Sequence, residues 1–288
     1  MTTTAAGTRQ QELAFLRVNG VRIAYADTGG TGTPLVLVHG SWGSHHNWDP
    51  VVPGLAEHLR VVSYDRRGHS DSERPPGQGH FSEDVIDLAA LIEQLGLAPA
   101  WVVGNSAGAV ITLKLAAARP DLLRGIVVHE PPLFGLLEEG SAEALELAEV
   151  ETGPLAEVGR RITAGDHAGA AEQFVEQVAF GPGSWAKLPE AMRAMMTNNA
   201  PTFLDELNDP ECSSVDETRL GAYDGPVLIT AGDQSPPIYQ PVERQLARLL
   251  PQAKRTTYAG AGHIPHVTHP EEYVAALVGF TESHEADR

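Results

Sequence analysis

Cysteine is almost absent from this sequence, because Cys212 is the only one among 288 residues. No internal disulfide can form, so nothing in the chain requires an oxidising compartment. Basic residues are also few: 20 Lys and Arg face 38 Asp and Glu, which leaves a formal net charge of −18. A field of that sign repels phosphate backbones and anionic lipid surfaces, which argues against nucleic-acid and membrane partners.

Long apolar runs are missing as well. No stretch approaches the roughly 18 apolar residues of a membrane span, and the first nine residues contain no apolar segment behind a basic start. These absences predict a cytoplasmic protein. Hydrophobic residues make up 42% of the chain, and 29 Gly and 21 Pro are spread along it, which is typical of a globular enzyme.

Short apolar runs alternate with helix-length segments, the pattern of strands that are joined through helices into a mostly parallel sheet. An antiparallel pair is predicted first, because residues 13–18 and 21–26 flank Asn19-Gly20, a strong hairpin signal. Buried parallel strands are predicted at residues 35–38, 61–64, 101–103, 125–128, 227–231 and 255–258. The predicted fold class is therefore α/β, with about eight strands and helices on both faces of the sheet.

One long segment breaks this alternation. Residues 82–95 and 107–118 have the pattern of crossover helices, but residues 131–224 are rich in Ala and Glu and contain no convincing strand. We expect residues 131–224 to form a helical cap, inserted after the sixth strand. Residues 12–130 and 225–282 would then form the core that carries it.

A motif that suits a nucleophile follows the strand at 101–103. Gly104-Asn-Ser-Ala-Gly108 runs from that strand into a helix. Its glycines allow a sharp, strained turn, where larger side chains would collide with neighbouring backbone. Strand, motif and helix in this order predict Ser106 as a nucleophile. The alternative is that Ser106 only caps the helix.

The strand at 35–38 ends in a second loop of interest, His39-Gly-Ser-Trp-Gly43. Such a loop can bring the backbone amide of Ser41, or that of Gly40, opposite the amide of Ala107. Together these amides would bind an oxyanion. His39 itself is expected to be structural.

A base must come from the remaining histidines. His263 ends the Gly-rich loop Tyr258-Ala-Gly-Ala-Gly-His263, which follows the last strand and can return the imidazole to Ser106. His266 is the runner-up, and His269 is expected at the entry of the final helix. His45 and His46 have no matched partners at metal-ligand spacing, so we expect solvated loop histidines there and no metal site.

The acid that orients the base has two candidates. Glu130 and Asp233 each follow a predicted strand. In the common arrangement the acid lies three residues after the glycine that closes the seventh strand, and Ser235 occupies that place here. Glu130 is therefore favoured, and Asp233 remains the alternative or a turn residue before two prolines. Asp65 also ends a strand, and we expect it to tie down its own loop.

These motifs, spread over nearly the whole chain, resemble the α/β-hydrolase superfamily. Three segments are similar to the fungal zearalenone lactonases: His-Glu-Pro-Pro at 129–132, Ala-Gly-Asp-Gln-Ser-Pro at 231–236, and the segment 262–270. This resemblance implies that Ser106, His263 and Glu130 form a triad and that Ser-Trp-Ala at 184–186 borders a lactone ring. The chain departs from those lactonases at His39-Gly40, where they have Asp-Gly, and throughout 131–224.

The sequence therefore predicts a serine hydrolase that cleaves a small-molecule ester or lactone through an acyl-enzyme, without metal or organic cofactor. A carbon–carbon bond hydrolase, a cofactor-free perhydrolase, and a small-molecule receptor with slow turnover are the alternatives, and a homodimer is left open. Trp185 is expected either in the core of the cap or at the substrate. The predicted substrate-binding residues are Trp42, Phe134, Leu136, Trp185, Met192, Met195, Phe203 and Ile264.

Overall fold

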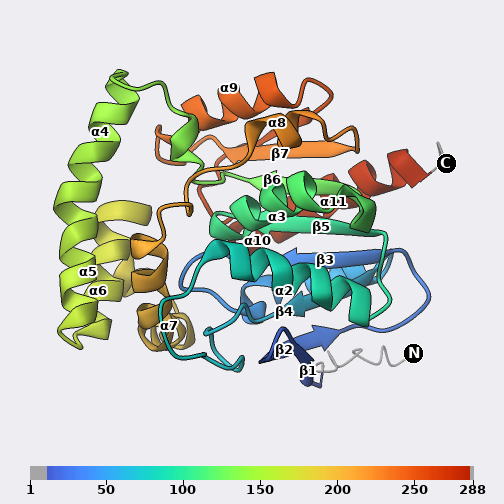
Figure 1. Ribbon diagram of the computed structural model, residues 1–288, viewed down its shortest axis with the longest axis horizontal. Helices are drawn as coiled ribbons and strands as arrows, with labels where there is room; N and C mark the ends of the chain where they lie inside the picture. Colours follow the sequence, from blue (N-terminus) through green and yellow to red (C-terminus); the bar gives the residue numbers. More distant parts are fainter. Residues whose placement is uncertain (1–11, 286–288) are drawn as a thin grey trace, which may run out of the picture.

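A computed structural model describes residues 12–285 of the chain. Eight strands form one sheet in the order β1-β2-β4-β3-β5-β6-β7-β8 (Figure 1). β1 and β2 are antiparallel, β2 joins β4 antiparallel, and all later neighbours are parallel. The predicted α/β class is confirmed. The strands are β1 Ala14–Val18, β2 Val21–Asp27, β3 Pro34–Val38, β4 Arg60–Tyr64, β5 Ala100–Asn105, β6 Leu123–His129, β7 Val227–Gly232 and β8 Lys254–Tyr258.

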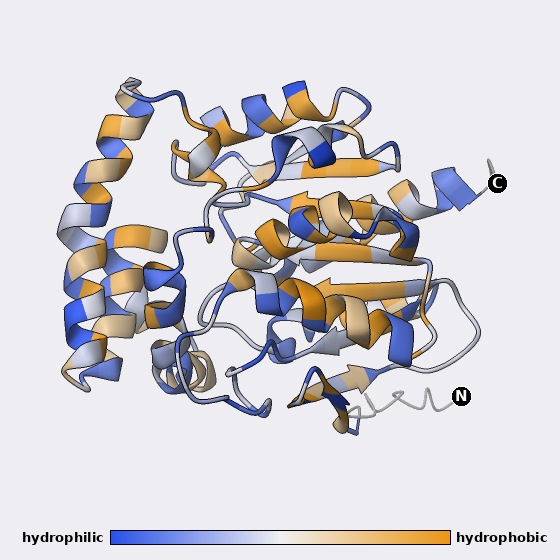
Figure 2. Ribbon diagram, in the orientation of Figure 1, coloured by the Kyte–Doolittle hydropathy of each residue, from blue (hydrophilic) through white to orange (hydrophobic). Residues whose placement is uncertain are grey.

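Helices cover both faces of this sheet, and each face has its own apolar cluster. On one face the sheet packs against α2 (Phe81–Gln94), α3 (Ala107–Ala118), α8 (Glu217–Gly221) and α9 (Tyr239–Leu249). On the other face it packs against α1 (Val52–Ala56) and α11 (Pro270–Glu285). Figure 2 shows the central strands as largely hydrophobic between helices of mixed hydropathy, which is expected of strands buried on both faces.

The chain between β6 and β7 is helical and contains no strand among the described residues. Helices α4 to α7 stand together beyond one side of the sheet (Figure 1). A third apolar cluster, from Val158 to Phe203, holds α5 to α7 together and includes Trp42 from the loop after β3. The helices of this segment are α4 Ala142–Val150, α5 Ala156–Thr163, α6 His167–Phe174, α7 Glu190–Asn208 and α8.

The strand order also locates the natural binding edge. From β3 the chain turns to one side to form β4, and then returns to the other side to form β5. Ligands of open α/β sheets bind outside the carboxyl ends of strands at such a reversal. The loops after β3 and β5 meet there. Within residues 12–285, no helix has both the length and the apolar character that crossing a bilayer requires.

Candidate active site

Ser106 occupies a sharp turn between β5 and α3. Its backbone has φ 55° and ψ −123°, a strained conformation that residues with a side chain rarely adopt. A Cβ on Gly104 would lie 2.3 Å from the Gly108 oxygen, and a Cβ on Gly108 would lie 2.1 Å from the Val38 oxygen. Only glycine fits on either side of this turn, which holds the serine at the carboxyl end of β5.

The loop after β3 contacts this turn directly. A Cβ on Gly40 would lie 3.0 Å from the Cβ of Ser106, so the two loops are as close as glycine allows. Ser41, Ser106 and Ala107 all line one cavity. The fold thus brings the predicted nucleophile and the residues predicted to bind an oxyanion to a single wall.

His263 is held beside the turn through its backbone. Asn105, the residue before Ser106, donates a hydrogen bond of 2.9 Å from Nδ2 to the His263 carbonyl. On the imidazole, Nδ1 lies 2.6 Å from Oε2 of Glu130, and both side chains are buried. Because an ionised carboxylate only accepts hydrogen bonds, Nδ1 carries a proton and donates it to Glu130.

Glu130 is fixed at the end of β6. Its backbone has a positive φ of 44°, and its Oε1 accepts a 2.8 Å hydrogen bond from the Gly232 amide. Burial would raise the pKa of this carboxyl, but the His129 and His263 rings beside it outweigh burial and hold the pKa well below its usual range. Glu130 is therefore ionised at neutral pH.

Asp233 is the alternative acid and His266 the alternative base. In the structure, each of them has contacts that stabilise its own loop or the core. Asp233 is exposed, and its Oδ1 accepts a 2.8 Å hydrogen bond from the Gly260 amide, which joins the loops after β7 and β8. His266 is buried against Trp48, with ring centroids 4.5 Å apart. Burial lowers the pKa of His266 to about 3, so it is a neutral core residue.

The loop histidines and Asp65 differ in part from expectation. Asp65 does tie down its loop, because it accepts 2.7 Å hydrogen bonds from both the backbone amide and Nδ1 of His45. His46 is exposed and pairs with Asp49, as expected of a solvated histidine. The prediction of a solvated histidine is wrong for His45, which is buried and hydrogen-bonded to Asp65.

Among residues 12–285, one group of side chains has the ligand atoms that a metal would need. Donor atoms of His129, Glu130 and His263 lie within 4.8 Å of one another. The 2.6 Å contact between His263 and Glu130 does not suit a metal, because two ligands that are each about 2.0–2.2 Å from one ion stand farther apart. A shared proton, not an ion, fits between them.

A cavity of about 980 Å³ opens from Ser106, at the large end of the range for ligand pockets. Its walls come mainly from the segment between β6 and β7, which includes α7, and from the start of α9. These walls are mostly apolar. Four carboxylates line it, and Arg160 is the one basic side chain among the described residues that do. The acidic lining residues are Glu146, Glu151, Glu206 and Asp209.

Comparison with known proteins agrees with this geometry. Residues 35–276 match the Alpha/beta hydrolase family. The chain belongs to this family. The sn-1-specific diacylglycerol lipase ABHD11 of Mus musculus is 26% identical over 94% of this chain and 88% of its own length.

Solved structures of other alpha/beta hydrolases share the fold. A thermophilic esterase from Thermogutta terrifontis superposes with a TM-score of 0.75 at 24% identity, covering 95% of this chain and 99% of its own. Est816, described as an N-acyl homoserine lactone degrading enzyme, superposes with a TM-score of 0.72 at 23% identity, covering 93% of this chain and 100% of its own.

In this alpha/beta hydrolase, helix α7 is tied to the loop after β3 through Glu206. Ser41 Oγ donates to Oε2 of Glu206 over 2.5 Å, and Oε1 accepts from Arg66 over 3.0 Å. Arg66 in turn binds both oxygens of Asp84 at 3.1 Å. Burial raises the pKa of Glu206, although Arg66 beside it opposes this shift. The side chains of Arg66, Asp84 and Glu206 are all buried.

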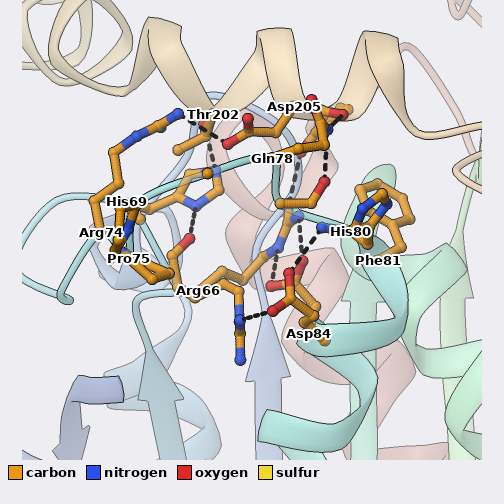
Figure 3. A pocket seen from close by; sticks show the side chains of 17 residues that line it. Arg66, His69, Arg74, Pro75, Gln78, His80, Phe81, Asp84, Thr202 and Asp205 are labelled. Atoms are coloured by element: carbon orange, nitrogen blue, oxygen red, sulfur yellow. Dashed lines mark hydrogen bonds and ion pairs between the residues drawn. The ribbon is translucent and has the colours of Figure 1, made fainter. Parts of the chain in front are cut away.

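Further contacts join α7 to the loop after β4 around a small cavity of about 70 Å³. Figure 3 shows the side chain of Arg66 pointing toward Asp84. Thr202 and Asp205 project from α7 toward the loop after β4. The residues of that loop nearest to them are His69, Arg74 and Gln78. Arg74 forms an ion pair of 2.9 Å with Asp205, and His69 Nε2 lies 2.9 Å from the Thr202 hydroxyl. These contacts fix α7 relative to the sheet, and with it Glu206.

Only two of the apolar residues predicted to bind substrate line the cavity, namely Phe134 and Phe203. Trp42 lies behind the wall, where its ring packs on Phe174 and Phe203. The third apolar cluster is also contacted by Trp185, Met192 and Met195. Of the two positions expected for Trp185, the core of the helical segment and the substrate pocket, the structure shows the first. Leu136 packs against the sheet core, and Ile264 is the residue before α10 (Pro265–Thr268).

Sequence reasoning missed the polar residues that line this cavity on the side of residues 131–224 and α9, among them Glu206 and Tyr239. Glu206 lies in a segment rich in Glu, where a carboxylate ordinarily indicates a solvated helix face. Tyr239 begins α9 and follows Pro236-Pro237 after β7. The rule that binding residues follow the carboxyl ends of parallel strands is the one signal that could have found Tyr239.

Proposed function

We propose that this chain is a serine hydrolase that cleaves uncharged esters or lactones, with Ser106 as nucleophile, His263 as base and Glu130 as acid. The observation that carries the proposal is the 2.6 Å contact between His263 Nδ1 and Glu130 Oε2. A carboxylate on Nδ1 leaves Nε2 free to take a proton and stabilises the imidazolium that results. The hydrogen bond from Asn105 to the His263 carbonyl keeps this ring beside the serine turn.

The chemistry follows from these roles. Ser106 passes its proton to His263 Nε2 as Oγ bonds to the carbonyl carbon, and the carbonyl oxygen takes up the negative charge. Backbone amides of Ala107 and of Ser41 or Gly40 stabilise that oxyanion. Collapse breaks the bond to the alcohol oxygen, which receives the proton from His263. Water then attacks the acyl-enzyme and frees the acid, with no metal or organic cofactor in any step.

The cavity favours a large, mostly apolar and uncharged substrate. Its volume of about 980 Å³ suits a bulky acyl or macrocyclic group, and residues 131–224 would act as the cap that encloses it. Four carboxylates against Arg160 make an anionic substrate costly to bind. A lipase and a lactone-degrading enzyme among similar proteins support ester and lactone cleavage. A zearalenone-type macrocyclic lactone is the narrower candidate, from the motif at 129–132.

The test is a mass-spectrometric assay of product formation. Purified wild type and Ser106→Ala are incubated with zearalenone, smaller lactones, neutral esters and, as a control for charge, monoesters of dicarboxylic acids. The proposal expects hydrolysis of neutral substrates by the wild type alone, with the anionic monoesters poorest. Ring opening would assign a lactonase, and ester cleavage without ring opening a carboxylesterase. No hydrolysis, or equal hydrolysis by Ser106→Ala, would contradict the proposal.

A further inference from the structure

Tyr239 lies flat against the imidazole of His263. The two ring centroids are 4.7 Å apart, and the planes differ by 13°. Phe134 packs on Tyr239 as well, with centroids 6.1 Å apart. Tyr239 is the first residue of α9, and the two preceding prolines have restricted backbones. Packing and backbone therefore fix the tyrosine relative to the imidazole.

The hydroxyl of Tyr239 reaches the nitrogen that transfers protons. Its Oη lies 3.4 Å from Nε2 of His263, which is long for a hydrogen bond. Nothing else in residues 12–285 forms a hydrogen bond with this hydroxyl. Tyr239 also lines the cavity that contains Ser106. A polar group is thus held at Nε2 with most of its hydrogen-bonding capacity unused.

From this position we infer that Tyr239 orients the water that hydrolyses the acyl-enzyme, an inference that rests on the function proposed above. Such a water must lie within hydrogen-bond reach of His263 Nε2, because Nε2 takes its proton. One hydrogen of the water points to Nε2, and Oη of Tyr239 accepts the other. A lone pair of the water oxygen then faces the acyl carbon on Ser106.

The proton balance of this step leaves Tyr239 unchanged. The water oxygen bonds to the acyl carbon, one water proton moves to His263 Nε2, and the carbonyl electron pair moves onto the oxyanion. Collapse breaks the bond between the acyl carbon and Ser106 Oγ, and His263 returns its proton to Oγ. Burial, with the negative charge of Glu130 nearby, raises the pKa of Tyr239, so its phenol stays protonated throughout.

Acylation does not need this water, so the two half-reactions should separate in a Tyr239→Phe variant. Phenylalanine keeps the ring stacked on His263 and removes only the hydroxyl. A p-nitrophenyl ester is the suitable substrate, because its leaving group departs without help from an acid. The matched control is Tyr273→Phe, since the Tyr273 hydroxyl is buried without a hydrogen-bond partner among the described residues.

We expect Tyr239→Phe to lower kcat about tenfold, the effect of one lost hydrogen bond of ordinary strength, and to lower KM in parallel. The value of kcat/KM and the rate of the p-nitrophenol burst should stay within about twofold of the wild type. Tyr273→Phe should change neither constant. An unchanged kcat, or equal losses in kcat and kcat/KM, would overturn the inference. Turnover that survives Ser106→Ala would instead contradict the proposed function.

Discussion

Glu130 Oε2 lies 2.6 Å from Nδ1 of His263, although the two residues are 133 positions apart in the chain. Glu130 directly follows β6, which pairs with β5, the strand that leads into Ser106. Asp233 follows β7, one strand farther away, and is bound to the Gly260 amide. Of the two carboxylates, Glu130 is therefore the one that contacts His263.

This pairing predicts opposite results for two matched variants. Glu130→Gln should lower kcat/KM by about 10³- to 10⁴-fold, because a neutral amide neither fixes the tautomer of His263 nor stabilises the imidazolium. Asp233→Asn should stay within about threefold of the wild type. Steady-state kinetics with a neutral ester near pH 8 measure both. A larger loss in Asp233→Asn would assign the acid to β7.

A second prediction concerns the buried His266 and its effect on stability. The native pKa of His266 is lowered to about 3, against 6.5 in an unfolded chain. Between pH 6.5 and 3 the unfolded state binds a proton that the native state does not, so this residue costs stability as the pH falls. His266→Phe removes the group that binds this proton in the unfolded state, and it keeps an aromatic ring packed on Trp48.

We expect the stability advantage of His266→Phe over the wild type to grow by about 1.4 kcal/mol for each pH unit between pH 6 and pH 4. Urea unfolding of both proteins at several pH values measures this difference. Parallel stability curves would show that His266 is not a buried neutral group. Hydrolysis should persist in the variant, because the proposed base is His263 and not His266.

The cluster around Arg66 gives a third prediction. Arg66 is the cation between the buried carboxylates of Asp84 and Glu206. Arg66→Met would leave two buried carboxylates without it, which should cost about 3–5 kcal/mol of stability or more. Glu206→Gln leaves Arg66 and Asp84 as a balanced pair, so it should cost only about 1 kcal/mol. Equal losses in urea unfolding would contradict this account.

The sheet and the motifs at its edge are predictable from sequence because they depend on local patterns. Apolar runs locate the eight strands, and the glycines at 104 and 108 indicate the strained turn at Ser106, since no side chain fits there. The preference for Glu130 over Asp233 follows from Ser235, because a serine cannot act as the carboxylate at that place. The role of the pair in catalysis stays a prediction.

The cavity wall was harder to predict, because helix packing decides it. Trp185, Met192 and Met195 have the apolar character of pocket residues, but the same character draws them into the cluster between helices. Glu206 shows the converse problem: its carboxylate turns inward to Arg66 and Ser41, contacts that no local pattern reveals. Arg66 and Ser41 lie 140 and 165 positions from Glu206 in the chain, and no shared motif connects them to it.

The measurement that tests the central claim most directly is covalent labelling of Ser106. Wild type, Ser106→Ala and His263→Ala are treated with a neutral fluorophosphonate, and the intact mass and the labelled peptide are determined. The account predicts a single adduct on the peptide that contains Ser106 in the wild type, much slower labelling in His263→Ala, and none in Ser106→Ala. Labelling at another residue, or equal labelling of all three proteins, would contradict it.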